Sequence, residues 1–415
     1  MKYFLIAGEA SGDLHASHLM QALSDEDKNA RFVGLGGDKM RAAGCDIRVD
    51  YRDMAYMGVI AVLLNLHKIQ RNFRIARQTL LTEQPDVLIL IDYPSFNLKM
   101  AQFCRRHLPH TRIIYYIPPK VWAWKAWRVH RIARYTDEVL GIFPFEPAFY
   151  ARYGYQCRYI GNPTADCIRD WKQSHPQSHT TSSTAANPNI AHPTDTLGSS
   201  LPTDKPLIAI LPGSRPSEIK HCLPTMLEAA RRVAAHDYHI IVAAAPGIED
   251  TFYAPYLLTE TLTRDTYALV ASARAAVVNS GTATLETALL GCPQTAVYYI
   301  ACSRWLEWLI RPIVFRIPFF TLVNIIPQSP VIQELIASRF TADNIEQELR
   351  RLLTDLPYRK RMTDYYALIS RLLGNAPAAI QAARIITHPK TNSSKTRENP
   401  EPTSTLRCKI VHHTK

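Results

Sequence analysis

The sequence lacks the features that mark secreted, zinc-binding and membrane-spanning proteins. Its eight cysteines are scattered and form no CxxC pair, which favours a reduced cytosolic protein over a disulfide framework or a zinc site. No apolar run of 18 residues is free of charge, so no transmembrane helix is predicted. The apolar part of the N-terminus is too short for a signal peptide. We therefore expect a cytoplasmic protein.

Two nucleotide-binding signatures are also missing. The loop after the first predicted strand does not read GxGxxG, and neither GxxxxGKS nor GxxxxGKT occurs, which argues against a dinucleotide site and against P-loop ATP hydrolysis. The acidic run at 25–27 has a DxD spacing, but a solvated turn is the simpler interpretation because its neighbours are polar. The sequence predicts no metal and no other cofactor.

Positive charge is in excess. The net charge is +12, and nine Lys or Arg with three Trp but no acidic residue lie between Lys99 and Arg134. Nucleic acid, an acidic membrane surface or a phosphorylated substrate would each suit such a chain, and a merely solvated basic surface is the alternative. We expect no nucleic acid, because that partner leaves the phosphate-binding loops described below unexplained.

A chain of 415 residues is too long for a single domain with one hydrophobic core, so two domains are expected. The hydrophobic pattern predicts that both are of α/β type. Strands and helices alternate in an N-terminal domain (1–172) and again in a C-terminal domain (206–388), as in doubly wound, Rossmann-like sheets. Residues 173–205, rich in Ser, Thr and Pro, are predicted to form a disordered insertion or linker, and 389–415 a disordered tail. Such domains hold a ligand in the cleft between them.

Two loops of the C-terminal domain suit a nucleotide diphosphate. Residues 276–293 read as strand, loop and helix, and the loop offers backbone N–H groups, hydroxyls and a helix N-terminus to phosphate. Arg215, after the strand at 207–211, offers a forked donor to phosphate oxygens, with a surface ion pair as the alternative. The Glu286 carboxylate, which follows the loop, could accept hydrogen bonds from the hydroxyls of a ribose. The predicted donor-binding residues are Arg215, Ser280, Gly281, Thr282, Thr284 and Glu286.

The N-terminal domain offers a base. Asp92 ends the buried strand at 87–92, where a carboxylate can deprotonate an incoming hydroxyl; a turn or helix cap is the alternative. The loop after the first strand is a second candidate region, with Asp13 and His15 as weaker candidates for the same role, although its glycines can also serve a tight turn only. The predicted acceptor-side residues are Gly8, Ser11, Gly12, Asp13 and His15.

An aromatic segment at 298–326 carries arginines and prolines, which argues against a membrane span and suits the plane of a membrane interface. A buried helical hairpin is the alternative. The predicted membrane or acyl contacts are Trp122, Trp124, Trp305, Trp308, Phe319 and Phe320.

These segments together resemble the lipid-A-disaccharide synthases, inverting glycosyltransferases of GT-B architecture. The resemblance covers almost the whole chain outside the insertion and the tail. It departs from the family pattern at Ala61, Asn162 and 328–330. The matching segments are AGEASGDLHA (7–16), GLGGDKMRAAG (34–44), YMG (56–58), LILIDYPSFNLKMA (88–101), YYIPPKVWAW (115–124), LPGSR (211–215), NSGTATLE (279–286) and VN (323–324).

The resemblance implies that UDP-2,3-diacylglucosamine donates its sugar to 2,3-diacylglucosamine 1-phosphate, giving a β(1→6) disaccharide phosphate and UDP. Asp92 then corresponds to the base, Arg215 to a diphosphate ligand, and Asn324 to a further donor contact. Acylated, anionic substrates imply peripheral contact with the cytoplasmic face of an anionic inner membrane. The family also contains dimers that exchange C-terminal segments, so a swapped homodimer is one expected arrangement.

Two alternatives remain at this point. Another GT-B enzyme that uses UDP-N-acetylglucosamine, either a transferase with a different acceptor or a 2-epimerase, would share the phosphate loops. An epimerase needs no apolar groove, so Trp305, Trp308, Phe319 and Phe320 argue against it. A non-catalytic lipid-binding homologue is the second alternative.

Overall fold

A computed structural model describes residues 1–54, 66–123, 126–176, 201–202, 204–235, 237–279, 281–300 and 318–389. Several predictions fall outside these ranges. They concern Trp124, Ser280, Trp305, Trp308, most of the insertion and nearly all of the tail.

The N-terminal domain is built on a parallel sheet of seven strands in the order β3-β2-β1-β4-β5-β6-β7. Chain order reverses between β1 and β4, the point where doubly wound sheets open a ligand crevice. Apolar runs such as VLILI in β4 are buried throughout, as expected of strands covered on both faces. The strands are β1 (Lys2–Ala7), β2 (Arg31–Gly36), β3 (Asp46–Asp50), β4 (Val87–Ile91), β5 (Arg112–Tyr116), β6 (Glu138–Gly141) and β7 (Arg158–Tyr159).

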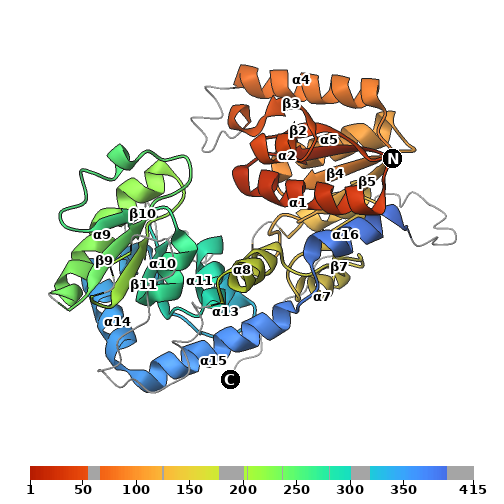
Figure 1. The fold of residues 1–415 in the computed structure, drawn as a ribbon. Helices are drawn as coiled ribbons and strands as arrows, with labels where there is room; N and C mark the ends of the chain where they lie inside the picture. The colour runs from red at the N-terminus through yellow and green to blue at the C-terminus, as the bar shows by residue number, and fades with distance from the viewer. Residues whose placement is uncertain are drawn as a thin grey trace.

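Helices cover both faces of this sheet (Figure 1). Helix α1 packs on one face together with the C-terminal helix α16, and α4, α5 and α6 pack on the other. Helix α1 begins at Ala10, so Ser11 to Asp13 lie in the first helical turn and not in the loop after β1. The helices are α1 (Ala10–Glu26), α2 (Asp38–Ala42), α4 (Leu66–Glu83), α5 (Pro94–His107), α6 (Arg128–Tyr135), α7 (Glu146–Ala151) and α8 (Pro163–Ser174), with the 3₁₀ turn η1 (Tyr51–Asp53).

The C-terminal domain repeats the plan with six parallel strands in the order β10-β9-β8-β11-β12-β13. Its strands are β8 (Leu207–Leu211), β9 (His239–Ala243), β10 (Thr261–Thr263), β11 (Ala273–Asn279), β12 (Gln294–Tyr298) and β13 (Glu334–Ile336). Its helices are α9 (Pro216–Ala234), α10 (Thr266–Ser272), α11 (Thr282–Leu290), α13 (Leu322–Ile325), α14 (Ala342–Thr354) and α15 (Leu356–Leu373), with the 3₁₀ turns η3 (Asp250–Phe252) and η4 (Ala337–Arg339). The predicted pair of doubly wound α/β domains is confirmed.

The end of the chain returns to the first domain. Helix α15 runs below the C-terminal domain towards the first domain, and α16 (Ala378–Thr387) lies against α1 (Figure 1). Ala382 and Ile386 are completely buried in this contact, and Arg112 Nη1 donates to the Ile386 carbonyl at 2.7 Å. None of the helices in the described ranges has the length and apolarity needed to cross a bilayer.

One glycine tests how tightly the returning segment is seated. Gly161 has φ +93°, and a Cβ there would stand 2.3 Å from the Ala376 carbonyl oxygen. Gly161→Ala should cost about 1–2 kcal/mol for the left-handed backbone and about 1–3 kcal/mol more for the collision. Gly154→Ala is the matched control, because its φ is +75° but nothing lies within 4 Å of a Cβ. Urea unfolding measures the free energy of unfolding of both variants. Equal losses of stability would show that the contact between Gly161 and Ala376 adapts to the added methyl group without cost.

Candidate active site

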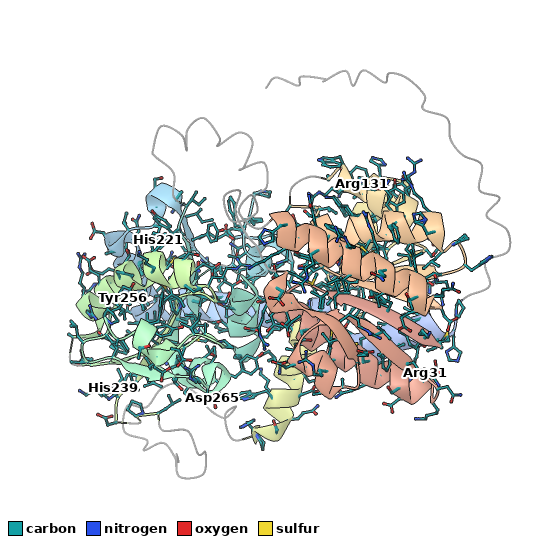
Figure 2. The ribbon with its side chains drawn as sticks, turned by 90° about the horizontal axis from the view of Figure 1, so that it is seen from above. Arg31, Arg131, His221, His239, Tyr256 and Asp265 are labelled. Carbon is teal, nitrogen blue, oxygen red and sulfur yellow. The ribbon has the colours of Figure 1, made fainter. Side chains whose placement is uncertain are left out.

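The predicted cleft exists where the carboxyl ends of the two sheets face each other. We call it the crevice and define it by Glu9, Asp92 and Lys120 on the N-terminal side and Arg215 and Gly281 on the other. Arg215 Nη2 stands 3.9 Å from Glu9 Oε2 across it. Lys120 and Gly281 line one cavity of about 140 Å³. Figure 2 shows the two domains side by side, with Arg31 and Arg131 at opposite edges of the first and His239 and Tyr256 in the second.

Asp92 directly follows β4 with a strained backbone. Its φ is +42° and that of Tyr93 is +44°, a left-handed region that costs a residue other than glycine about 1–3 kcal/mol. The Asp92 carbonyl accepts hydrogen bonds from Asn97 Nδ2 and from the Tyr115 hydroxyl, both at 2.7 Å. Gly8 permits this turn, because a Cβ at Gly8 would lie 2.4 Å from the Tyr93 ring. These contacts fix the Asp92 backbone, and the side chain is exposed to the crevice.

The surroundings make Asp92 a stronger base than an ordinary aspartate. Poor hydration within the crevice, with a smaller contribution from the negative charge of Glu9, raises the pKa of Asp92 to about 6. Lys120 and the Tyr93 amide oppose that rise. The carboxylate still has accessible surface, so a substrate can reach it. At neutral pH it is ionised and has a pKa that suits general-base catalysis.

Lys120 and Glu146 are two ionisable residues that the sequence does not single out. Burial lowers the pKa of Lys120, and the negative charges of Asp92, Glu146 and Glu9 oppose this. Glu146 has no exposed surface, and burial raises its pKa to about 7 although the Phe143 and Ile142 amides donate to it. The sequence signal that could identify Lys120 is its position shortly after β5, because β5 lies beside β4 and both strands end at the same edge of the sheet.

Arg215 stands at the start of α9 between carboxylates of both domains. Its Nη1 donates to Glu218 Oε1 at 3.2 Å, and Glu218 Oε2 accepts from the Ser214 amide at 3.0 Å. Gly213 has φ +122°, and a Cβ there would lie within 2.8 Å of Glu218 and Asn279 atoms. The tight turn therefore aims the guanidinium, which is about half exposed, into the crevice.

The start of α11 presents part of the predicted phosphate loop. Gly281 and Thr282 are exposed, and no side chain caps the helix there. Glu286, farther along α11, is partly buried, and its Oε1 accepts from the Tyr267 hydroxyl at 3.4 Å. Thr284, in contrast, is fully buried and donates to the Gly281 carbonyl at 2.9 Å. It supplies loop structure rather than the free hydroxyl that the sequence predicts.

Asp13 caps a neighbouring helix in the structure, and its acceptor-side role stays a prediction. Its buried carboxylate accepts from the amides of Gly37 at 2.7 Å, Lys39 at 3.0 Å and Met40 at 3.1 Å. The carboxylate thus caps the start of α2. Burial lowers the pKa of neighbouring His15 to about 4, which keeps that imidazole neutral at pH 7.

Gly12 and Ser11, the other residues predicted on the acceptor side, differ in their exposure. Gly12 is buried, and a Cβ there would contact Ala7 at 3.4 Å and Ile91 at 3.6 Å, so it serves packing of α1 on the sheet. Ser11 is exposed on the first turn of α1.

Asn324 is hydrogen-bonded to the segment that follows it, and its contact with the donor stays a prediction. Its Nδ2 donates to the Ile332 carbonyl at 2.9 Å and to Glu334 Oε1 at 3.0 Å, while its Oδ1 accepts from the Val331 and Ile332 amides. The side chain is 2% exposed. These four bonds hold the segment that leads into β13.

Of the aromatic residues predicted to contact a membrane or an acyl chain, those in the described ranges are partly buried. Trp122 packs edge-on against Phe143 and Phe145, with ring centroids 5.9 and 5.0 Å away. Trp122 and Phe320 both line the cavity beside Lys120. Phe319 is half-buried. The Trp122 indole therefore lies between the domains, and its membrane or acyl contact stays a prediction.

Asp13→Ala should destabilise the fold by about 3 kcal/mol, because three buried amides lose a charged acceptor. Asp25→Ala is the control, since Asp25 is 86% exposed and pairs only loosely with Lys28 at 3.8 Å. Thermal unfolding should separate the two variants clearly. A normal melting temperature with lost turnover would instead place Asp13 in the chemistry.

Comparison with known proteins identifies the family. A family model described as lipid-A-disaccharide synthetase matches residues 3–383. The lipid-A-disaccharide synthase of Geobacter sulfurreducens is 33% identical over 392 residues, covering 93% of this chain and 96% of that protein. The enzyme of Nitrosococcus oceani is 34% identical over 378 residues, covering 89% and 92%.

Solved structures share the fold at low identity. The UDP-N-acetylglucosamine 2-epimerase of Methanocaldococcus jannaschii, in complex with its UDP-sugar and UDP, has a TM-score of 0.56 at 11% identity, covering 93% of this chain and 99% of that one. The calicheamicin glycosyltransferase CalG4 has a TM-score of 0.53 at 14% identity, covering 92% and 97%. Within the described ranges, no three His, Cys, Asp or Glu side chains cluster as metal ligands would. Two parallel-sheet domains of GT-B type and a match from residue 3 to residue 383 show that the chain belongs to the lipid-A-disaccharide synthase family.

Proposed function

We propose that the crevice transfers 2,3-diacylglucosamine from its UDP conjugate to 2,3-diacylglucosamine 1-phosphate. The products are a β(1→6)-linked disaccharide 1-phosphate and UDP. The observation that carries this proposal is the placement of Asp92, a base with pKa about 6, across the crevice from Arg215 and the start of α11. A base on one side and phosphate ligands on the other are the two parts that an inverting transfer needs.

The reaction is a single displacement. Asp92 takes the proton from the acceptor 6-hydroxyl while that oxygen bonds to the donor anomeric carbon. The bond from that carbon to the diphosphate breaks on the opposite face, and the electron pair leaves with UDP. Arg215 and the amides at the start of α11 stabilise the charge that develops on the phosphate. Glu286, below this loop, is the proposed ribose contact.

Product analysis tests the proposal against other GT-B chemistry. Purified protein is mixed with UDP-2,3-diacylglucosamine and 2,3-diacylglucosamine 1-phosphate, and mass spectrometry follows UDP and the lipid-extracted disaccharide. Both products should appear together. A 2-epimerase would change UDP-N-acetylglucosamine without an acceptor, and a non-catalytic homologue would release no UDP.

We further propose that α4 and α5 contact the anionic cytoplasmic face of the inner membrane. They form a groove of about 590 Å³ that combines cations with apolar side chains. The Arg77 guanidinium lies over the Phe73 and Phe103 rings at 5.7 and 5.1 Å, and Leu81 is 44% exposed. Arginine stems beside exposed apolar groups suit the headgroup region of an anionic bilayer. The groove residues are Gln70, Phe73, Arg74, Arg77, Gln78, Leu81, Lys99 and Phe103.

A homodimer that exchanges C-terminal segments also belongs to the proposal. Helix α16 docks on α1 through side chains and through the Arg384–Glu26 ion pair at 3.2 Å. The same surface would accept α16 from a second copy. Light scattering at several protein concentrations distinguishes a monomer from a dimer.

Asp92→Asn should lower kcat about 10²–10⁴-fold while UDP affinity is kept, because the base is lost but the phosphate ligands remain. In the wild type, kcat/KM should fall as pH drops below about 6, since the carboxylate becomes protonated through its raised pKa. Asp86→Asn, before the start of β4, is the matched control. The ionised Asp92 carboxylate is disfavoured by its site, so the melting temperature of the Asp92→Asn variant at pH 7 should not decrease. Full turnover in Asp92→Asn would exclude it as the base.

Arg215→Met should weaken UDP binding about 10- to 100-fold, the range expected when a charged hydrogen-bond donor to phosphate is removed. Isothermal titration calorimetry measures the change. Arg264→Met, which removes an exposed arginine paired with Asp250 in the same domain, should bind UDP normally. An unchanged UDP affinity in Arg215→Met would contradict the diphosphate role.

A further inference from the structure

The crevice contains a cation that the mechanism above does not use. Lys120 follows β5, which pairs with β4 so that Tyr116 lies opposite Ile91. The ends of these two strands therefore place Lys120 beside Asp92. Ile117 has φ +60°, and Pro118 and Pro119 restrict the backbone before Lys120. The position of the lysine is set by the sheet and by a stiff turn.

In the part of the chain that the structure describes, no side chain or backbone group is a close partner of the Lys120 ammonium. No hydrogen bond, and no ion pair within 4.0 Å, connects it to a described residue. Carboxylates act on it at longer range only, and burial lowers its pKa. The Lys120 side chain is exposed to the crevice, and an ammonium without a close anion gains a charge-assisted contact when it binds one.

The cavity beside Lys120 shows where such an anion would lie. Trp122 and Ala123 extend its N-terminal wall, and Gly281 contributes the opposite wall with apolar Phe320, Leu322 and Ile325. Gly281 is the N-cap of α11 and has no side-chain cap. A phosphate at the start of α11 would thus face Lys120 from the other domain.

We propose that Lys120 binds the β-phosphate of the UDP-sugar, so that both domains hold the leaving diphosphate. This inference rests on the function proposed above. Arg215 and α11 bind from the C-terminal domain, and Lys120 binds from the N-terminal domain. Lys120 keeps its proton throughout, because the proton of the acceptor hydroxyl goes to Asp92 and the only bond that breaks joins the anomeric carbon to the phosphate oxygen. Donor binding then also draws the domains together.

The test compares UDP with UMP, which lacks the β-phosphate, on the full-length protein by titration calorimetry. Lys120→Met should weaken UDP binding about 10- to 100-fold and UMP binding less than about threefold, because only UDP carries the phosphate in question. Lys120→Arg should recover most of the UDP affinity. Lys360→Met is the matched control, since Lys360 is 78% exposed on α15 and pairs with Asp364.

Three results would overturn the inference. They are an unchanged UDP affinity in Lys120→Met, an equal loss for UDP and UMP, and a loss confined to the KM for the acceptor, which would assign Lys120 to the acceptor phosphate. Melting curves check that each variant is folded, and Lys120→Gln replaces Lys120→Met if the latter unfolds. Failure of the proposed function is distinguishable, because the wild type itself would then release no UDP from the two lipid substrates.

Discussion

Opposite charges held across the crevice are the constraint on which the site depends. Glu9 and Asp92 follow two strands of the first sheet, Lys120 follows a third, and Arg215 meets Glu9 from the second sheet at 3.9 Å. Each charge keeps some contact with water, since the Arg215 and Glu9 side chains are 47% and 38% exposed, but like charges alone would repel one another across so short a distance. Together they nearly balance, so the fold tolerates a base of raised pKa next to cations placed for phosphate.

Parallel strands explain why these groups meet. All strands of each sheet run in one direction, so the residues that follow them collect at one edge. The first sheet contributes the base and the second contributes Arg215 and the start of α11. The strained turn at Asp92 and Tyr93 is accommodated by Gly8, which leaves room for the tyrosine ring. Local sequence and sheet geometry therefore agree at the point where the chemistry is proposed.

Much of the fold could be predicted from the sequence because buried parallel strands are continuous apolar runs, and Asp92 and Arg215 stand directly after such runs. The remaining polar residues could not be sorted in this way. Asp13 and Asn324 occur in similar glycine-rich or turn-like contexts, yet both are saturated by amides of other segments. Lys120 is the converse case, since its importance comes from neighbours in the other domain. Hydrogen-bond partners distant in sequence decide these roles.

The return of the chain to its first domain restricts how the two halves can move. Helix α15 packs into the core of the second domain and α16 into that of the first, and residues 374–377 connect them. Because each helix is held in a different core, a relative movement of the domains has to bend the chain at these four residues. Opening and closing of the crevice should thus depend on a joint that lies outside the site itself.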